Sequence, residues 1–268
     1  MNYWLSLSIE YANQRSYLDD LFQVYPTIPE GIREIDENIW KKIEDAFKKR
    51  DNEKLIKELL NLELFPIKDS YVAYLKRDRT AIKRNPKTVN RLCGRLYEMG
   101  LSEIYKRASE PKETNRQIGP MFRKWIQKGS LGIQPVPLSK FIESKDDAIL
   151  DASDSEMANF AKENLNYTID KGLDFIARFN GKYVIGEAKF LTDFGGHQNA
   201  QFNDAVKIFE IEDLLEKAGA VPIAILDGVL YIKGNNKMYR QITTEYKDKN
   251  IMSALVLREF LYQLWKIE

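Results

Sequence analysis

The sequence predicts a mixed α+β (α/β) protein with a large helical part ahead of its strands. Apolar residues recur at the three- and four-residue spacing of helices through the first half of the 268-residue chain. The second half contains short strand-like runs separated by helical stretches, in the order β-β-α-β-β-α. This change of pattern divides the chain into a helical region over 1–112 and a core over 113–268, either as two domains or as one continuous domain.

Composition excludes several classes of protein. With 41 Lys+Arg against 40 Asp+Glu and 44% hydrophobic residues, the chain is of an ordinary globular type. A single cysteine excludes a disulfide framework, and a single histidine disfavours Cys/His zinc sites. Cys93 is expected to be a packed side chain. The start has no basic stretch followed by an apolar run, and no segment approaches the ~20 apolar residues of a membrane span. We therefore expect a cytoplasmic protein with no membrane partner.

The helical half divides at prolines and glycines. Pro86 is expected at the start of one helix and Gly100 at its end, because proline is tolerated in a first helical turn and glycine favours a helix terminus. The spacing predicts helical stretches over 3–24, 35–61, 69–83, 87–99 and about 115–127.

The second half is predicted from alternation, caps and turns. Ser153 or Asp154 can cap a helix, and Asp227-Gly228 between two apolar runs is a hairpin turn signal. The resulting elements are helices over 154–164, 198–217 and 251–266, and strands over 172–179, 182–191, 221–226 and 229–233.

Charge is segregated along the chain. Residues 76–95 carry eight basic side chains and one acid, whereas 141–175 carry nine acids and three lysines. A basic segment can neutralise backbone phosphates, and an acidic stretch can hold divalent cations, which together suit a metal-dependent phosphodiesterase. Within the basic segment we expect Lys83, Arg84 and Arg91 to bind DNA. The alternative, that each run is only a solvated helix face, is equally open for the basic segment.

A hairpin carries the most informative charged residues. Asn180-Gly181 between two apolar runs favours a two-residue type I′ turn, and such a turn fixes the register so that paired positions sum to 361. Asp174 then lies opposite Glu187. Lys189 shares the face of Glu187, because side chains alternate along a strand.

These charges do not lie on a simple water-facing surface. Ile176 and Ile185 share their face, while the other face of the hairpin is apolar. Two opposed carboxylates repel and need a cation or a raised pKa, and carboxylate oxygens suit Mg²⁺. The sequence therefore predicts a magnesium site, with a charged surface network as the alternative.

The pattern Asp174…Glu187-Ala188-Lys189 resembles the PD-(D/E)xK nuclease motif, over residues 150–233 at most. The resemblance implies a restriction-endonuclease-like core, a central mixed sheet flanked by helices. It also implies that Asp174, Glu187 and the Ala188 carbonyl bind the metal and that Lys189 is catalytic. Leu173 replaces the proline of the motif. A glutamate of the preceding helix commonly joins such sites, and we select Glu163, with Glu156 as second choice.

Chain size and the helical half before the hairpin resemble a type II restriction endonuclease. The resemblance implies Mg²⁺-dependent, sequence-specific hydrolysis of phosphodiester bonds in double-stranded DNA by a homodimer, since two-fold symmetry matches palindromic sites. No Walker motif is present. The alternatives are a structure-specific repair or junction-resolving nuclease and a non-catalytic nucleic-acid-binding protein.

Two further segments are candidates for DNA contact. The first is a predicted helix start whose basic and amide side chains could read bases; the alternative is an ordinary capped helix. The second follows the catalytic strand, where paired glycines permit close approach to a ligand; the alternative is a flexible loop with amide caps. The candidates are Arg116, Gln117, Arg123 and Lys124 in the first segment and His197, Gln198, Asn199 and Gln201 in the second.

Overall fold

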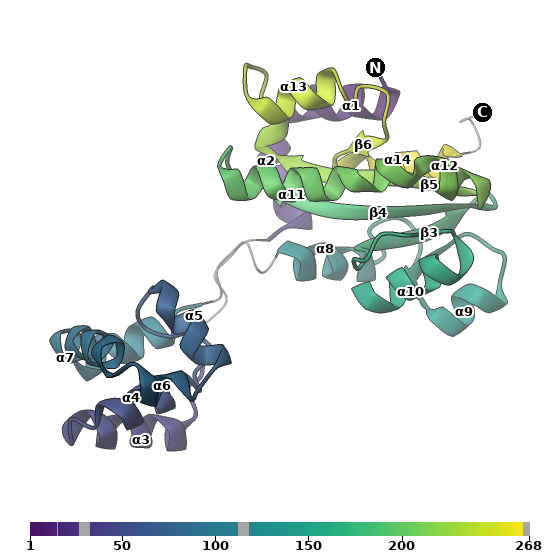
Figure 1. Ribbon diagram of the computed structural model, residues 1–268. Coiled ribbons are helices and arrows are strands. Elements are labelled where there is room, and N and C mark those ends of the chain that lie inside the picture. Colours follow the sequence, from purple (N-terminus) through teal and green to yellow (C-terminus); the bar gives the residue numbers. More distant parts are fainter. Residues whose placement is uncertain (15, 27–32, 112–117, 265–268) are drawn as a thin grey trace. The chain divides into compact units, whose positions relative to one another are not determined.

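The computed structural model describes residues 1–14, 16–26, 33–111 and 118–264. The chain forms two compact units, Met1–Thr27 with Thr114–Glu268, and Ile28–Glu113 (Figure 1). The helical unit therefore begins at Ile28, whereas the helical region was expected to begin at residue 1. Leu5 of α1 (Tyr3–Ala12) and Leu21 of α2 (Tyr17–Val24) are buried in the core of the sheet unit, which is why these helices belong there.

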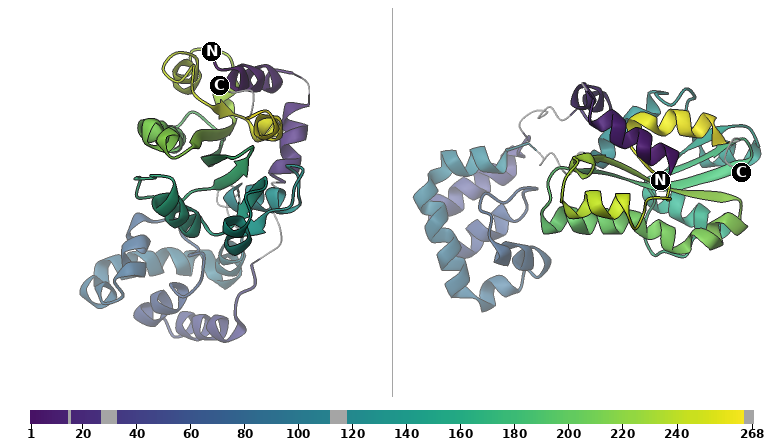
Figure 2. Two further views of the ribbon diagram at one scale, coloured as in Figure 1. Left: turned by 90° about the vertical axis from the view of Figure 1, so that its right-hand side faces the viewer. Right: turned by 90° about the horizontal axis from the view of Figure 1, so that it is seen from above.

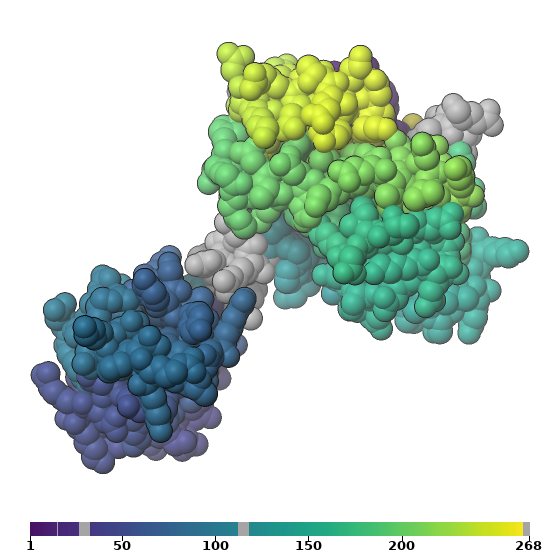
Figure 3. All heavy atoms as spheres, in the orientation of Figure 1, coloured from purple at the N-terminus to yellow at the C-terminus, as the bar shows by residue number. Residues whose placement is uncertain are grey.

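The helical unit has its own apolar core, and its atoms form one dense body in the space-filling view (Figure 3). Two of the expected stretches are each divided into two helices. Asp51, inside 35–61, caps a new helix start by accepting a hydrogen bond from the Lys54 amide. Asp78, inside 69–83, follows the end of one helix and accepts a hydrogen bond from the Thr80 amide. The helices are α3 (Glu37–Lys48), α4 (Asn52–Leu59), α5 (Ser70–Arg77), α6 (Ala81–Arg84) and α7 (Pro86–Ala108).

Gly100 divides α7 into two helical stretches. Its φ of 75° and ψ of 160° are not helical, so the first stretch ends there, and a second stretch continues to Ala108. The predicted helix end at this glycine is therefore confirmed, whereas the helical stretch after it was not predicted.

The second unit is built on a six-stranded mixed sheet. The strands lie in sequence order, β2–β3 and β3–β4 pair antiparallel, and the other neighbours pair parallel. Three strands are too short for their alternation to be read from the sequence, and these were missed: β1 (Val136–Pro137), β2 (Ala148–Asp151) and β6 (Ile251–Met252).

The predicted hairpin is confirmed. β3 (Phe175–Phe179) and β4 (Lys182–Leu191) pair with Phe179 opposite Lys182, as the two-residue turn requires. Asn180 and Gly181 both have positive φ, 51° and 76°, which is the type I′ geometry.

The second predicted hairpin is wrong. β5 (Ala220–Gly228) runs straight through Asp227-Gly228 beside β4, and the next residues form a short 3₁₀ turn, η3 (Val229–Tyr231). Asp227 is fully buried and accepts hydrogen bonds from Tyr25 and Ser253. These tertiary contacts hold this dipeptide in the strand.

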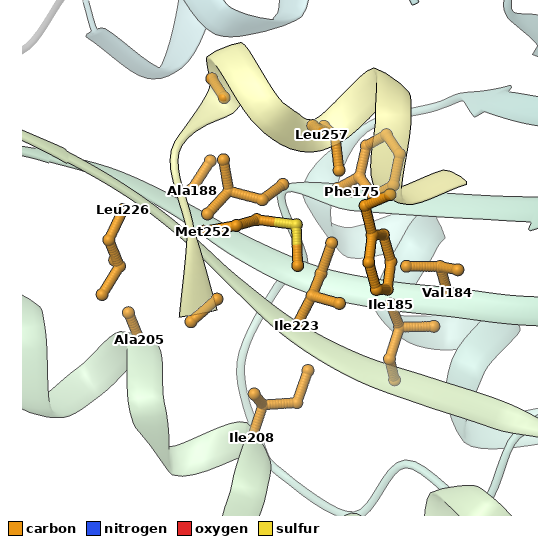
Figure 4. Close-up of a cluster of buried hydrophobic side chains, with 14 of the residues drawn as sticks. Phe175, Val184, Ile185, Ala188, Ala205, Ile208, Ile223, Leu226, Met252 and Leu257 are labelled. Carbon is orange, nitrogen blue, oxygen red and sulfur yellow. The ribbon is translucent and has the colours of Figure 1, made fainter. Parts of the chain in front are cut away.

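Helices cover both faces of the sheet (Figure 2). In the core, Leu257 of α14 (Ala254–Tyr262) lies on one side of the strands, and Ala205 and Ile208 lie on the other (Figure 4). Every residue of β3 is buried, as expected for a strand covered on both faces.

The remaining helices agree with prediction in part. Those at 154–164 and near 115–127 are confirmed as α10 (Asp154–Asn164), capped by Ser153, and α8 (Ile118–Gln127). Stretches predicted as single helices are divided: 3–24 breaks before α2, where Ser16 has a φ of 69°, and 251–266 begins as strand β6. The 198–217 stretch becomes α11 (Gly196–Val206), η2 (Lys207–Ile211) and α12 (Glu212–Lys217), while α9 (Leu138–Glu143) and α13 (Lys237–Thr243) were not predicted.

Among the described residues, no helix has both the length and the apolar character that a membrane crossing demands.

Candidate active site

The hairpin places three predicted site residues together. Asp174 directly precedes β3, where its amide donates to the Gly186 carbonyl and continues the ladder. Glu187 and Lys189 lie two apart on β4, so they share one face.

The Lys189 ammonium is the centre of this group. Its Nζ lies 2.6 Å from Asp174 Oδ2, 3.0 Å from Glu187 Oε2 and 3.1 Å from the Ala188 carbonyl oxygen. The Ala188 amide also donates to Asp174 Oδ2 at 2.9 Å. The three groups expected from the sequence to be metal ligands thus converge on one point. In this structure the Lys189 ammonium occupies that point.

Burial makes these charges interact strongly. Only 4% of the Glu187 side chain is exposed. Burial, and next the nearby Asp174 carboxylate, raise the pKa of Glu187 to about 7. Burial also acts to raise the pKa of Asp174, but attraction to Lys189 and the hydrogen bonds to Lys189 and the Ala188 amide hold that pKa below its ordinary value. The pKa of each carboxylate therefore depends on the charges of the other carboxylate and of the lysine.

A second lysine, which the sequence motif does not include, also reaches Glu187. Lys171 Nζ lies 2.8 Å from Glu187 Oε2 and forms an ion pair with Asp204 of α11. No local pattern pointed to this pair, because Asp204 lies 33 residues after Lys171 in the sequence and belongs to a different element.

An open cleft of about 610 Å³ is lined by Lys171, Asp174, Glu187 and Lys189. A neighbouring cleft of about 320 Å³ shares Arg123, Asp154 and Asp174 with it and is lined also by Lys124. Arg123 forms an ion pair with Asp154 at the start of α10. Two of the predicted DNA contacts on α8 therefore line a cleft together with Asp174.

The acidic partner expected from α10 is not brought to this cleft. Glu163 is exposed and does not line it, and Glu156 accepts hydrogen bonds from the Ser153 amide and hydroxyl in a capping box. Asp154, at the first position of the same helix, is the acid that lines both clefts. Helical phase alone could not select it, because the choice depends on which end of α10 faces the hairpin.

The segment after β4 uses its amides to hold itself in place. Buried Gln198 accepts a hydrogen bond from the Thr192 amide, and Asn199 Nδ2 donates to the carbonyls of Phe194 and Gly195. His197 is exposed and lies 3.2 Å from Gln201 through Nε2 atoms. Gln198 and Asn199 thus bond to the backbone of the segment, whereas His197 and Gln201 contact each other at its surface.

The other predicted DNA contacts differ in their surroundings. Arg116 and Gln117 lie outside the described residues. Arg84 pairs with Asp78 and Arg91 with Asp69, each at 2.6 Å, whereas exposed Lys83 makes no ion pair within the described part of the chain.

The donor set fits a hard divalent cation. Glu187 Oε1 is buried without a hydrogen-bond partner, and the Asp174 carboxylate and Ala188 carbonyl supply further oxygens. Within the described ranges no three His, Cys, Asp or Glu side chains gather as a metal cluster. Two carboxylates and one carbonyl suit Mg²⁺, which keeps several waters and uses few protein ligands.

The mixed sheet and the charged trio on its central hairpin define a restriction-endonuclease-like fold. The family model described as "Tsp45I type II restriction enzyme" matches residues 2–264, and the chain belongs to this family. The resemblance to type II restriction endonucleases is thereby confirmed, and at the level of the family the protein is a restriction endonuclease. No curated protein and no solved structure matched the chain in the corresponding comparisons.

Proposed function

We propose that this protein is a Mg²⁺-dependent type II restriction endonuclease with a PD-(D/E)xK centre, which hydrolyses phosphodiester bonds of double-stranded DNA at a specific sequence. The convergence of Asp174, Glu187 and the Ala188 carbonyl on the Lys189 ammonium carries the proposal. Membership of the restriction enzyme family supports DNA as the substrate.

In this proposal each group has a separate role. Asp174, Glu187 and the Ala188 carbonyl hold the cation. When bound, Mg²⁺ would polarise the scissile phosphate and lower the pKa of a water. Lys189, freed from these oxygens, donates to a phosphate oxygen and stabilises the negative charge that develops there.

The chain offers one such centre among its described residues, and a duplex has two strands to cut. We therefore propose that two copies act together as a homodimer, as two-fold symmetric sites require. Arg123 and Lys124, beside the centre, would contact the DNA closest to the scissile bond. His197 and Gln201 are further candidates, and Arg116 and Gln117 remain predictions.

The test of this centre is cleavage of plasmid DNA by shape-preserving variants. Asp174→Asn and Glu187→Gln remove one negative charge each from the cation site, so cleavage should fall at least about 100-fold in Mg²⁺. Glu216→Gln removes the same charge from an exposed site on α12 and should cleave normally. Normal cleavage by both site variants would reject the centre. A smear instead of discrete fragments from the wild type would reject sequence specificity.

The helical unit is proposed to bind DNA phosphates through its unpaired cations. Arg77, Lys83, Lys87 and Arg95 are exposed and make no ion pair with described residues, unlike Arg84 and Arg91. Each phosphate contact contributes about 0.9 to the slope of log K against log salt concentration.

Fluorescence anisotropy of a duplex in EDTA can therefore distinguish the two groups. Replacing Lys83 and Lys87 with Gln should lower the salt slope by about 1–2. Replacing paired Arg84 and Arg91 with Gln should lower it less, because their charges are already neutralised. An unchanged slope in the Lys83/Lys87 variant would contradict phosphate binding by this segment.

A further inference from the structure

Lys171 occupies a place at the centre that the motif leaves unexplained. Its ammonium contacts Glu187 Oε2 at 2.8 Å from one side, while Asp204 binds the same ammonium. The side chain is 29% exposed and lines the larger cleft. Lys171 precedes β3 and Asp204 belongs to α11, so the ion pair joins two elements that flank the hairpin.

The two lysines differ in what they touch. Lys189 contacts all three groups of the proposed cation site, and it reaches Glu187 through Oε2, so a cation held by Asp174 and the Ala188 carbonyl would displace it from those two oxygens. Lys171 contacts only Glu187 among them, and Asp204 holds it from the other side. Its contact with Glu187 is therefore the one that can persist when the site is filled.

Glu187 needs such a partner. Its carboxylate is almost fully buried next to that of Asp174, and repulsion between the two acts to turn the Glu187 side chain away. With Oε2 bound to Lys171, Oε1 is the oxygen left free, and it is buried without a partner.

We propose that Lys171, anchored by Asp204, is a positioning residue that fixes the Glu187 carboxylate so that Oε1 serves as a cation ligand. The inference rests on the proposed function, since it assigns a role toward the same cation. It adds two residues outside the motif, one of them on the helix that follows the catalytic strand.

A different role for Lys171, direct contact with a DNA phosphate, makes distinct predictions. A phosphate contact would weaken DNA binding when removed and would not depend on Asp204. A positioning role leaves DNA binding intact, lowers the rate of the chemical step, and couples Lys171 to Asp204 energetically. An idle surface ion pair would change neither quantity.

The experiment compares Lys171→Met, Lys171→Arg, Asp204→Asn and the double variant Lys171→Met/Asp204→Asn. Single-turnover cleavage is measured in Mg²⁺, and duplex affinity is measured in EDTA by anisotropy. Lys217→Met, on exposed α12, controls for the loss of one positive charge. Thermal unfolding of each variant identifies any that fails to fold.

We expect Lys171→Met to lower the single-turnover rate about 10–100-fold, the usual effect of losing a partner that orients a metal ligand. Its duplex affinity should stay within about threefold of wild type. This is a small change in binding free energy, since a tenfold change in affinity corresponds to about 1.4 kcal/mol. Lys171→Arg should recover much of the rate, because a guanidinium can bridge both carboxylates. Asp204→Asn should cost less, and the double variant should be no slower than Lys171→Met alone.

Several outcomes would overturn the proposal. These are wild-type cleavage by folded Lys171→Met, loss of duplex affinity that matches the loss of rate, and additive effects of the two single changes. A wild-type protein that cleaves no DNA in Mg²⁺ would reject the proposed function itself, which is a separate result.

Discussion

Two dipeptides with the same turn signal have opposite outcomes in neighbouring strands. Asn180-Gly181 forms the predicted hairpin, with φ of 51° and 76°. Asp227-Gly228 stays in β5, and only Gly228 has a positive φ, 99°. The first dipeptide is a local turn at the end of two pairing strands, whereas the second is held by contacts from distant parts of the chain.

Those distant contacts converge on the Asp227 carboxylate. The hydroxyls of Tyr17, Tyr25 and Ser253 and the amide of Ala254 all donate to it. A turn would move this buried acid away from its donors and leave them unpaired, which is costly. Local propensity therefore decides a turn only where tertiary contacts do not oppose it.

The two strand regions also differ in what their buried charges do. We infer that the charges on β3–β4 serve reactivity and that Asp227 on β5 serves stability. The following changes separate these roles. The substitutions come first, from the largest expected effect to the smallest, and a change of pH follows.

Lys189→Met should abolish cleavage while the protein stays folded. In the proposed mechanism the ammonium stabilises charge on the phosphate, so its loss should cost about 10³-fold in rate. Quantified plasmid cleavage together with thermal unfolding measures both quantities. If the variant unfolds and its folded fraction still cleaves at the wild-type rate, Lys189 serves stability. The distinction between the two strand regions would then be lost.

Asp227→Ala should destabilise the protein by about 3 kcal/mol, because several buried donors lose their acceptor at roughly 1 kcal/mol or more each. Urea unfolding gives the free energy. The folded fraction should still cleave DNA, since none of these donors lines the cleft. A stability equal to wild type would show that the buried carboxylate is not what holds this segment.

Matched glycine substitutions compare the two turns directly. Gly181→Ala should cost about 1 kcal/mol, since a Cβ there meets nothing within 4 Å and only the positive φ is penalised. Gly228→Ala should cost more, because its Cβ would lie 2.1 Å from the Leu191 carbonyl oxygen. Equal unfolding free energies for the two variants would contradict the difference in packing.

The last expected effect is a pH dependence of stability, which accumulates gradually between pH 4 and pH 6. Burial raises the pKa of Asp227 to about 6, opposed by the hydrogen bonds from Ser253, Ala254 and the two tyrosines. The native protein thus binds this proton more tightly than the unfolded chain, whose aspartate pKa is about 3.9. The group stabilises the native state fully below pH 4, and this contribution is lost as pH rises through 6.

Asp227→Asn provides the reference, because it does not titrate. The unfolding free energy of wild type relative to this variant should fall between pH 4 and pH 6, by at most about 1.4 kcal/mol per pH unit. A difference that rises over this range would mean that the carboxylate is ionised in the native protein.

The centre could be predicted from the sequence because its parts are local. A two-residue turn fixes the register, and the register alone brings Asp174 to Glu187 and Lys189. The places of Lys171 and Asp154 in the cleft, and the pairing of Lys171 with Asp204, could not be predicted, because they depend on how other parts of the chain pack against the hairpin, which the sequence pattern does not encode.

The fold shows the same limit. Long helices with clear spacing were predicted in type, but their breaks at Arg50, Asp78 and Ser16 depend on single capped or left-handed residues. Strands of two to four residues, such as β1 and β6, carry too little alternation to be recognised and form only by pairing with longer neighbours.

One measurement tests the central claim most directly: digestion of a single plasmid by the wild-type protein in Mg²⁺, in EDTA, and in EDTA followed by excess Mg²⁺, with the ends mapped. Asp174, Glu187 and Lys189 acting on DNA with a divalent cation predict discrete fragments in Mg²⁺, none in EDTA, and the same fragments on restoration. Equal cleavage in EDTA, or no cleavage in any condition while the duplex is bound, would contradict it.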